Sequence, residues 1–305
     1  MKKLFYIFCL FSFLLAIKMV GSSSAQINQE KSVIFKAPRL PIVVGDEQSK
    51  LRYLATNYWA ELDAANFFKY ERSSLETSFS GYCSLLNQLS IDETSVYIEL
   101  FVGKVAQSES STSYFLELAD RYLYHPNSPY RNEDCYTAFL EELLKKKAIT
   151  NANRTYTYIQ RLELLKKNRV GYMATDFSVE CNASRKYRLY DINSEFVLLL
   201  LYDPSCEICK GTISYLAAND KVSNLISSKK LTIFAVNPDG YSELWLQQQQ
   251  LMPQSWIVGY DAEQQIRANQ LYDLKALPSL YLLDRRKMVL IKDGNVEEVI
   301  GHLPI

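Results

Sequence analysis

The sequence predicts an all-α domain followed by an α/β domain in which helices flank a central mixed sheet. Three observations carry this prediction. Apolar residues recur at helical spacing from about residue 46 to residue 167. From about residue 171 onward, strand-like apolar runs alternate with helical stretches, which is the pattern of an α/β layer. Within that second part, the sequence FVLLLLY at residues 196–202 leads into a C-x-x-C motif.

The first 25 residues have the layout of a cleaved secretory signal peptide. The positively charged start MKK precedes an apolar run at residues 4–17 and the small-residue stretch GSSSA at residues 21–25. We therefore expect an exported protein, periplasmic or otherwise. An uncleaved N-terminal anchor is the lesser alternative, because Lys18 interrupts the apolar run and leaves it short for a membrane span. No membrane span is expected after cleavage.

Charge and size set limits on the mature chain. Removing residues 1–25 takes away three lysines and no acids, so 34 Lys and Arg against 34 Asp and Glu become 31 against 34. This near-neutral balance gives no reason to expect nucleic acid as a partner. The remaining residues 26–305 are too many for one small domain and fit two domains of ordinary size.

Residues 26–44 read as a linker, because they are polar and then extended, with Pro38 and Pro41 discouraging helix. Residues 45–167 read as a helical domain of unknown function, and Asn132 is placed to cap one of its helices. Its aromatic stripes could line a ligand groove, but aromatic residues at helical spacing are more often core packing. The predicted helices cover stripes at 51–62, 79–89, 96–106, 114–122, 136–144 and 156–165.

Residues 168–305 read as the α/β domain. The runs at 196–202 and 231–236 are apolar on both faces, as central parallel strands are. The runs at 279–283 and 288–291 predict a hairpin, which makes the sheet mixed rather than purely parallel. A helix beginning at Cys209 is expected between the first two strands.

The motif Cys206-Glu207-Ile208-Cys209 has the spacing that reversible dithiol-disulfide chemistry requires. At a helix N-terminus, unpaired N–H groups and the helix dipole favour a thiolate. Half of a zinc site has the same spacing, but the other cysteines are scattered singly, and His125 and His302 have no ligand spacing. We therefore predict redox chemistry with no metal and no cofactor.

Five cysteines remain after signal cleavage, so at least one stays unpaired in an oxidising compartment. Cys83 and Cys135 could form a structural disulfide, but each also sits among apolar residues as a plain core cysteine does. Both alternatives are open.

From about residue 170 to its end, the chain resembles the TlpA/ResA-like thioredoxin-fold proteins of bacterial envelopes. The segment GYMATDF at 171–177 resembles the family's opening G-x-x-A-x-D-F, and DPSCEIC at 203–209 matches its active-site loop. Trp256 falls in its usual central insertion, and LPS at 277–279 matches its proline loop. The N-terminal half resembles a poorly characterised helical domain found ahead of such modules in exported bacterial proteins.

The resemblance implies a role for each matched residue. Cys206 would be the attacking thiolate and Cys209 the resolving thiol, with Pro278 in the cis form. Leu277 would present its backbone to an extended substrate segment. The remaining residues expected to face the substrate are Pro204, Ser205, Glu207 and Ile208.

The chain also departs from the family. Many relatives place a buried acid on the strand before the dithiol or in the first turn after it, whereas this chain has Leu200 and Thr212 there. Proton transfer from Cys209 would then use water, Asp203 or Glu207, and should be slower. The negative charge of Glu207 favours a weakly oxidising, reductant-like couple over a strong disulfide donor.

These features predict an exported thiol-disulfide oxidoreductase that reduces or exchanges disulfides of envelope proteins. Its expected partners are protein thiols or disulfides and an upstream electron donor, which a dithiol needs to stay reduced after export. The alternative is a redox-inactive binding or scaffold protein in which the helical domain recognises a partner.

Overall fold

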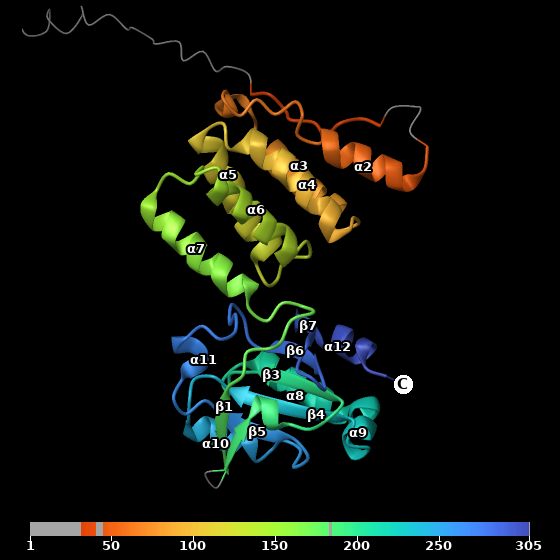
Figure 1. Ribbon diagram of the computed structural model, residues 1–305, viewed down its shortest axis with the longest axis vertical. Coiled ribbons are helices and arrows are strands. Elements are labelled where there is room, and N and C mark those ends of the chain that lie inside the picture. Colours follow the sequence, from red (N-terminus) through yellow and green to blue (C-terminus); the bar gives the residue numbers. More distant parts are fainter. Residues whose placement is uncertain (1–31, 41–44, 183–184, 305) are drawn as a thin grey trace, which may run out of the picture.

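The computed structural model describes residues 32–40, 45–182 and 185–304 (Figure 1). The predicted signal peptide at residues 1–25 lies outside the described residues. A helical domain is followed by a mixed sheet with flanking helices, so the predicted fold class is confirmed. Within the described part of the chain, no helix has both the length and the apolar character needed to cross a bilayer.

Five helices of the helical domain have first turns that are capped by side chains. Asp46, Ser90, Ser108, Asn132 and Asn151 each accept a hydrogen bond from a backbone N–H three residues on, which satisfies a donor that the helix leaves unpaired. The cap predicted at Asn132 is therefore present. The elements are α2 (Glu47–Asn57), η1 (Phe67–Lys69), α3 (Arg72–Leu86), α4 (Ile91–Val105), α5 (Glu109–Ala119), the π-helical turn η2 (Asp120–Tyr124), α6 (Glu133–Lys145) and α7 (Ala152–Lys166).

Aromatic side chains fill the core of this domain, as the helical spacing predicted. Trp59 stacks on Phe101 at a centroid distance of 4.9 Å, and Phe101 meets Phe115 edge-on at 5.1 Å. Cys83 and Cys135 are both buried free thiols in the same core. Burial raises the pKa of Cys83, and it raises that of Cys135 to about 12, so both behave as inert core residues.

Part of the predicted linker packs against the helical domain instead. Val33 bridges to Tyr70 in parallel, and the buried Phe35 stacks on Trp59 at 5.0 Å. Val33 and Phe35 are therefore part of the helical domain, because an extended backbone with an apolar side chain can complete a core without forming a helix. The bounds of the linker stay a prediction.

The second domain is built on a seven-stranded sheet with the order β2-β1-β5-β4-β3-β6-β7. Strands β3, β4 and β5 are parallel, whereas β1, β6 and β7 pair antiparallel with their neighbours. The strands are β1 (Ser178–Cys181), β2 (Lys186–Arg188), β3 (Phe196–Leu201), β4 (Leu231–Asn237), β5 (Ile257–Tyr260), β6 (Ser279–Asp284) and β7 (Val289–Gly294).

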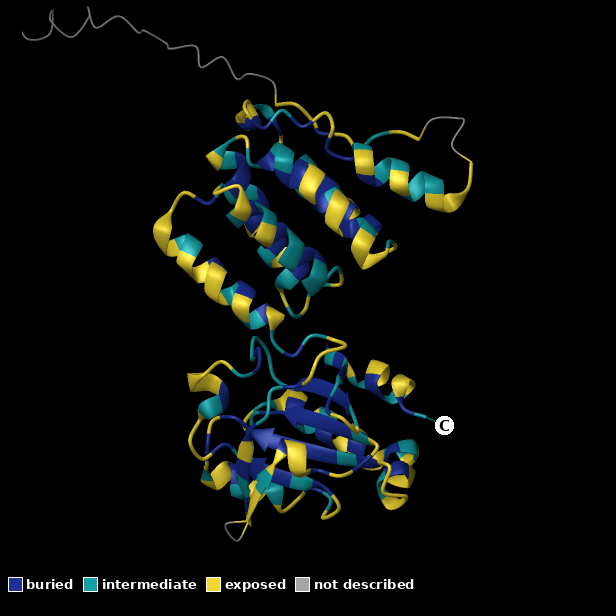
Figure 2. Cartoon of the chain, in the orientation of Figure 1, coloured by how far each residue is buried: buried dark blue, intermediate teal, exposed yellow. Residues whose placement is uncertain are grey.

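Both faces of the sheet are covered, which explains why β3 is apolar throughout and β4 is mostly apolar (Figure 2). Leu198 and Leu200 belong to one core, and Val197, Leu199 and Leu201 belong to the core on the opposite face. The helical elements of this domain are η4 (Leu189–Asp191), α8 (Glu207–Ala218), α9 (Asp220–Ser227), α10 (Glu243–Gln249), α11 (Gln265–Ala268) and α12 (Val296–His302).

The structure differs from the sequence prediction at one point near the motif. Helix α8 begins at Glu207 rather than at Cys209, because Cys206 itself is the N-cap residue. Both cysteines therefore lie within the first turn.

Replacing Gly259 with alanine should lower the free energy of unfolding by about 1 to 3 kcal/mol. Gly259 pairs with Cys181 where β5 meets β1, and a Cβ there would lie 2.6 Å from Val179 Cγ2 and 2.9 Å from the Glu180 carbonyl oxygen. Urea denaturation measures the effect, and Gly211→Ala is the control, because no atom of the described residues lies within 4 Å of a Cβ at that exposed position. Equal unfolding midpoints for the two variants would contradict this packing.

Candidate redox site

The dithiol lies where β3 ends and α8 begins, at the carboxyl edge of the parallel strands. A short loop turns the chain, and Asp203 shapes it by accepting hydrogen bonds from Ser205 N at 2.7 Å and Ser205 Oγ at 2.8 Å. The Cys206 sulfur then accepts the backbone N–H of Cys209 at 3.2 Å. This contact is an N-cap hydrogen bond to sulfur, and it places the first thiol at the positive end of the helix dipole.

The two sulfurs have different environments, as sequential exchange chemistry requires. Cys206 is partly exposed, whereas Cys209 is fully buried. Burial raises the pKa of Cys209 to about 12, and the neighbouring Cys206 and Asp203 add to this, while a backbone hydrogen bond with Asp203 opposes it. Cys206 is thus accessible for attack, and Cys209 is protected against competing thiols.

A second loop faces the dithiol from the start of β6. The peptide bond between Leu277 and Pro278 is cis, as the family resemblance implied. The Cys206 thiol lies 3.6 Å from the Leu277 carbonyl oxygen and donates to it. The structure therefore brings Cys206, Cys209, Leu277 and Pro278 together.

The other predicted site residues near the dithiol differ in their exposure to solvent. Ile208 is 72% exposed and Ser205 is exposed, whereas Pro204 is buried against the helix. The Glu207 side chain is exposed and its carboxylate lies 2.6 Å from Lys210 Nζ. Lys210 therefore offsets part of the negative charge that we expected Glu207 to bring to the dithiol.

The structure also shows the two positions at which the family resemblance implied a buried acid. Leu200 is fully buried in the sheet, and Thr212 is half-buried on α8. Of the two acids considered for proton transfer, Asp203 is close enough to contribute to the pKa of Cys209, while Glu207 points to solvent.

The raised pKa of Cys209 has a kinetic consequence. Release of a mixed disulfide by Cys209 should accelerate about tenfold per pH unit between about pH 6 and 8, because the thiolate fraction grows tenfold per unit well below the pKa. Rapid mixing of a preformed mixed disulfide at Cys206 measures this rate. A plateau near neutral pH would show that burial does not hold Cys209 in its thiol form.

One feature beside the dithiol was not predicted from the sequence. A groove of ≈ 440 Å³ runs between α8 and α10, with Pro204, Ile213, Leu244, Leu251 and Met252 among its lining residues. No helix was predicted at α10, and the periodicity of a single helix does not show that a gap separates it from another helix.

A cap-position thiol after a central strand, a buried second thiol and a facing proline loop in a mixed sheet define a thioredoxin-like domain. The chain aligns with a crystal structure of a thioredoxin-like protein from Bacteroides caccae with a TM-score of 0.84 and 31% identity, over 88% of this chain and 98% of the other. Residues 18–168 match the family described as a domain of unknown function, DUF5106. The chain therefore belongs to the family of thioredoxin-like proteins represented by the Bacteroides caccae structure, and its DUF5106 domain precedes the thioredoxin-like domain.

Shorter structures match less than half of the chain. A C-terminal domain of an uncharacterized protein from Bacteroides fragilis has 34% identity and a TM-score of 0.44, over 45% of this chain and 97% of the other. The thioredoxin domain of a thiol-disulfide oxidoreductase from Bacteroides vulgatus has 19% identity and a TM-score of 0.39, over 44% of this chain and 94% of the other. No curated protein matches the chain.

Proposed function

We propose that this protein is an exported thiol-disulfide oxidoreductase that reduces or exchanges disulfides of other envelope proteins through Cys206 and Cys209. The observation that carries the proposal is the pairing of an accessible cap thiol with a fully buried thiol in the same helical turn. The signal-like residues 1–25 support export, and an exported dithiol needs an upstream electron donor to stay reduced.

The mechanism follows from the different environments of the Cys206 and Cys209 sulfurs. The Cys206 thiolate attacks one sulfur of a substrate disulfide, forming a mixed disulfide and releasing the other substrate sulfur as a thiolate. Cys209 then loses its proton and attacks Cys206, which frees the second substrate thiol and leaves a Cys206–Cys209 disulfide. The substrate disulfide is thereby reduced and the protein dithiol oxidised, and two electrons from the donor restore it.

The substrate segment would lie between the dithiol and the Leu277–Pro278 loop. The Leu277 backbone faces Cys206 and is available to pair with an extended peptide. Asp203 is our candidate for accepting the Cys209 proton, directly or through water, because its charge acts on that thiol. Exposed Ile208 would contact the substrate next to its cysteine.

An insulin-reduction assay with dithiothreitol as the electron source tests this function. The mature protein should accelerate precipitation of the insulin B chain above the rate with dithiothreitol alone. Acceleration no greater than that of a Cys206/Cys209 double serine variant would favour the alternative, a scaffold in which the helical domain recognises a partner.

A further inference from the structure

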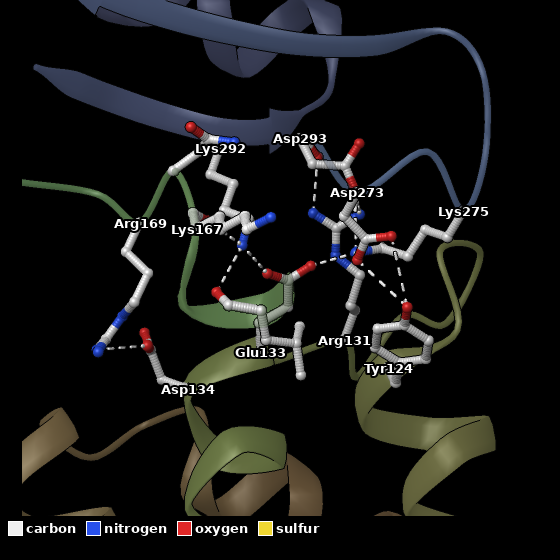
Figure 3. A network of polar contacts seen from close by, with 12 residues as sticks. Tyr124, Arg131, Glu133, Asp134, Lys167, Arg169, Asp273, Lys275, Lys292 and Asp293 are labelled. Atoms are coloured by element: carbon white, nitrogen blue, oxygen red, sulfur yellow. Dashed lines mark hydrogen bonds and ion pairs between the residues drawn. The ribbon is translucent and has the colours of Figure 1, made fainter. Parts of the chain in front are cut away.

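Six ionisable residues from both domains form a cluster at the domain junction (Figure 3). We call them the junction cluster, and they comprise three cations and three anions. Its members from the helical domain are Arg131 and Glu133, and its members from the thioredoxin-like domain are Asp273, Lys275, Lys292 and Asp293.

Glu133 stands at the centre of this cluster, at the first residue of α6. Its carboxylate pairs with Lys275 Nζ through one oxygen, and its other oxygen lies 2.9 Å from Lys292 Nζ. An acid is also favoured here because the helix N-terminus is the positive end of the dipole. Burial alone would raise the pKa of Glu133, but the two lysines outweigh it and hold that pKa below its usual value.

The contacts continue on the thioredoxin-like side. Lys275 Nζ lies 3.1 Å from Asp273 Oδ2 and 3.4 Å from Asp293 Oδ2. Arg131 reaches across the junction and donates to the Asp293 carboxylate at 3.1 Å and to the Asp293 carbonyl oxygen at 2.6 Å. The side chains of Lys275, Asp273 and Asp293 are 7%, 4% and 8% exposed, so these pairs are shielded from solvent.

The junction cluster contacts both ends of the loop that faces the dithiol. Lys275 lies two residues before Leu277, whose carbonyl oxygen contacts the Cys206 thiol. On the other side of Pro278, Ser279 Oγ donates to Asp293 Oδ1 at 2.9 Å. Glu133 fixes the first end through Lys275, and Arg131 fixes the second end through Asp293.

We propose that Glu133 is a positioning residue of the redox site, through which the helical domain sets the Leu277–Pro278 loop for binding an extended protein substrate. This inference rests on the proposed oxidoreductase function and gives the helical domain a role in it. A small disulfide needs the Cys206 thiolate but little of the loop, whereas a protein segment must also pair with the Leu277 backbone. Loss of the Glu133 charge should therefore affect protein substrates selectively.

The test compares Glu133→Gln with Glu141→Gln in the full mature chain. Glu141 lies on the same helix in an exposed pair with Lys166, so it controls for the loss of one carboxylate. Substrates are insulin and the small aromatic disulfide 5,5′-dithiobis(2-nitrobenzoate). For Glu133→Gln we expect the KM for insulin to rise about tenfold, with its kcat and the rate with the small disulfide within about twofold of wild type.

Two further variants separate positioning from stability. Glu133→Asp keeps the charge and should recover part of the KM. Arg131→Lys keeps the charge but loses the second donor to Asp293, so it should also raise the KM for insulin. This variant tests the proposal independently if Glu133→Gln folds poorly. If a folded Glu133→Gln or Arg131→Lys protein has the insulin KM of Glu141→Gln, the positioning role is refuted. If the wild-type protein itself does not reduce insulin, the proposed function fails instead.

Discussion

Replacing Cys206 with serine should lower the rate of protein disulfide reduction by about 10³-fold or more, to the background of the small-thiol donor. A serine hydroxyl can keep the cap hydrogen bond to Cys209 N but cannot form a mixed disulfide. Cys209 cannot replace Cys206, because it is fully buried and its pKa is raised to about 12. Insulin reduction with a fixed concentration of dithiothreitol measures the loss.

Cys181→Ala is the matched control, since Cys181 is a buried free thiol in the same domain that lies outside the dithiol loop. It should keep the wild-type rate within about twofold. A Cys206→Ser protein as active as Cys181→Ala would show that Cys206 is not needed for disulfide reduction.

Replacing Cys209 with serine has a different expected result. The Cys209→Ser protein should accumulate covalent adducts at Cys206 in the native compartment, because no resolving thiol remains.

Replacing Lys275 with methionine should lower the free energy of unfolding by about 3 to 5 kcal/mol, which is the usual cost of removing one partner from a buried ion pair. Methionine fills a similar volume, so the effect is electrostatic. Without Lys275, Glu133, Asp273 and Asp293 lose a cation that contacts all three carboxylates. Urea denaturation followed by circular dichroism measures the change.

Lys186→Met provides the comparison. Lys186 pairs with Glu180 at 3.2 Å on the same domain, but its side chain is 68% exposed, so its loss should change stability by about 0.5 kcal/mol or less. A Lys275→Met protein as stable as Lys186→Met would mean that the buried ion pairs of Lys275 contribute no more to stability than an exposed ion pair does.

The sequence predicted the main elements because their patterns are local. Helical stripes located α2 to α7, and doubly buried runs located β3 and β4. The short strands β1, β2 and β5 were not predicted, since three or four residues carry too little periodicity. Phe35 was assigned to a linker because its partners, Trp59 and Tyr70, lie far along the chain.

The dithiol and its facing loop were predictable for a different reason. Cys206 and Cys209 lie in one short motif, separated by two residues, and the family resemblance supplied Leu277 and Pro278. The junction cluster was not predicted, because nothing in the local sequence distinguishes Glu133 or Lys275 from a solvated surface charge. Their separation of 142 residues is bridged by packing of the two domains.

A redox titration of the mature protein tests the central claim most directly. The protein is equilibrated in defined thiol-disulfide buffers and its free thiols are then alkylated. Mass spectrometry measures the extent of alkylation at Cys206 and Cys209. We expect a reversible two-electron transition at these two cysteines within roughly −270 to −120 mV, toward the reducing end. A motif that shows no reversible transition in that window would contradict the account and leave a structural bridge in its place.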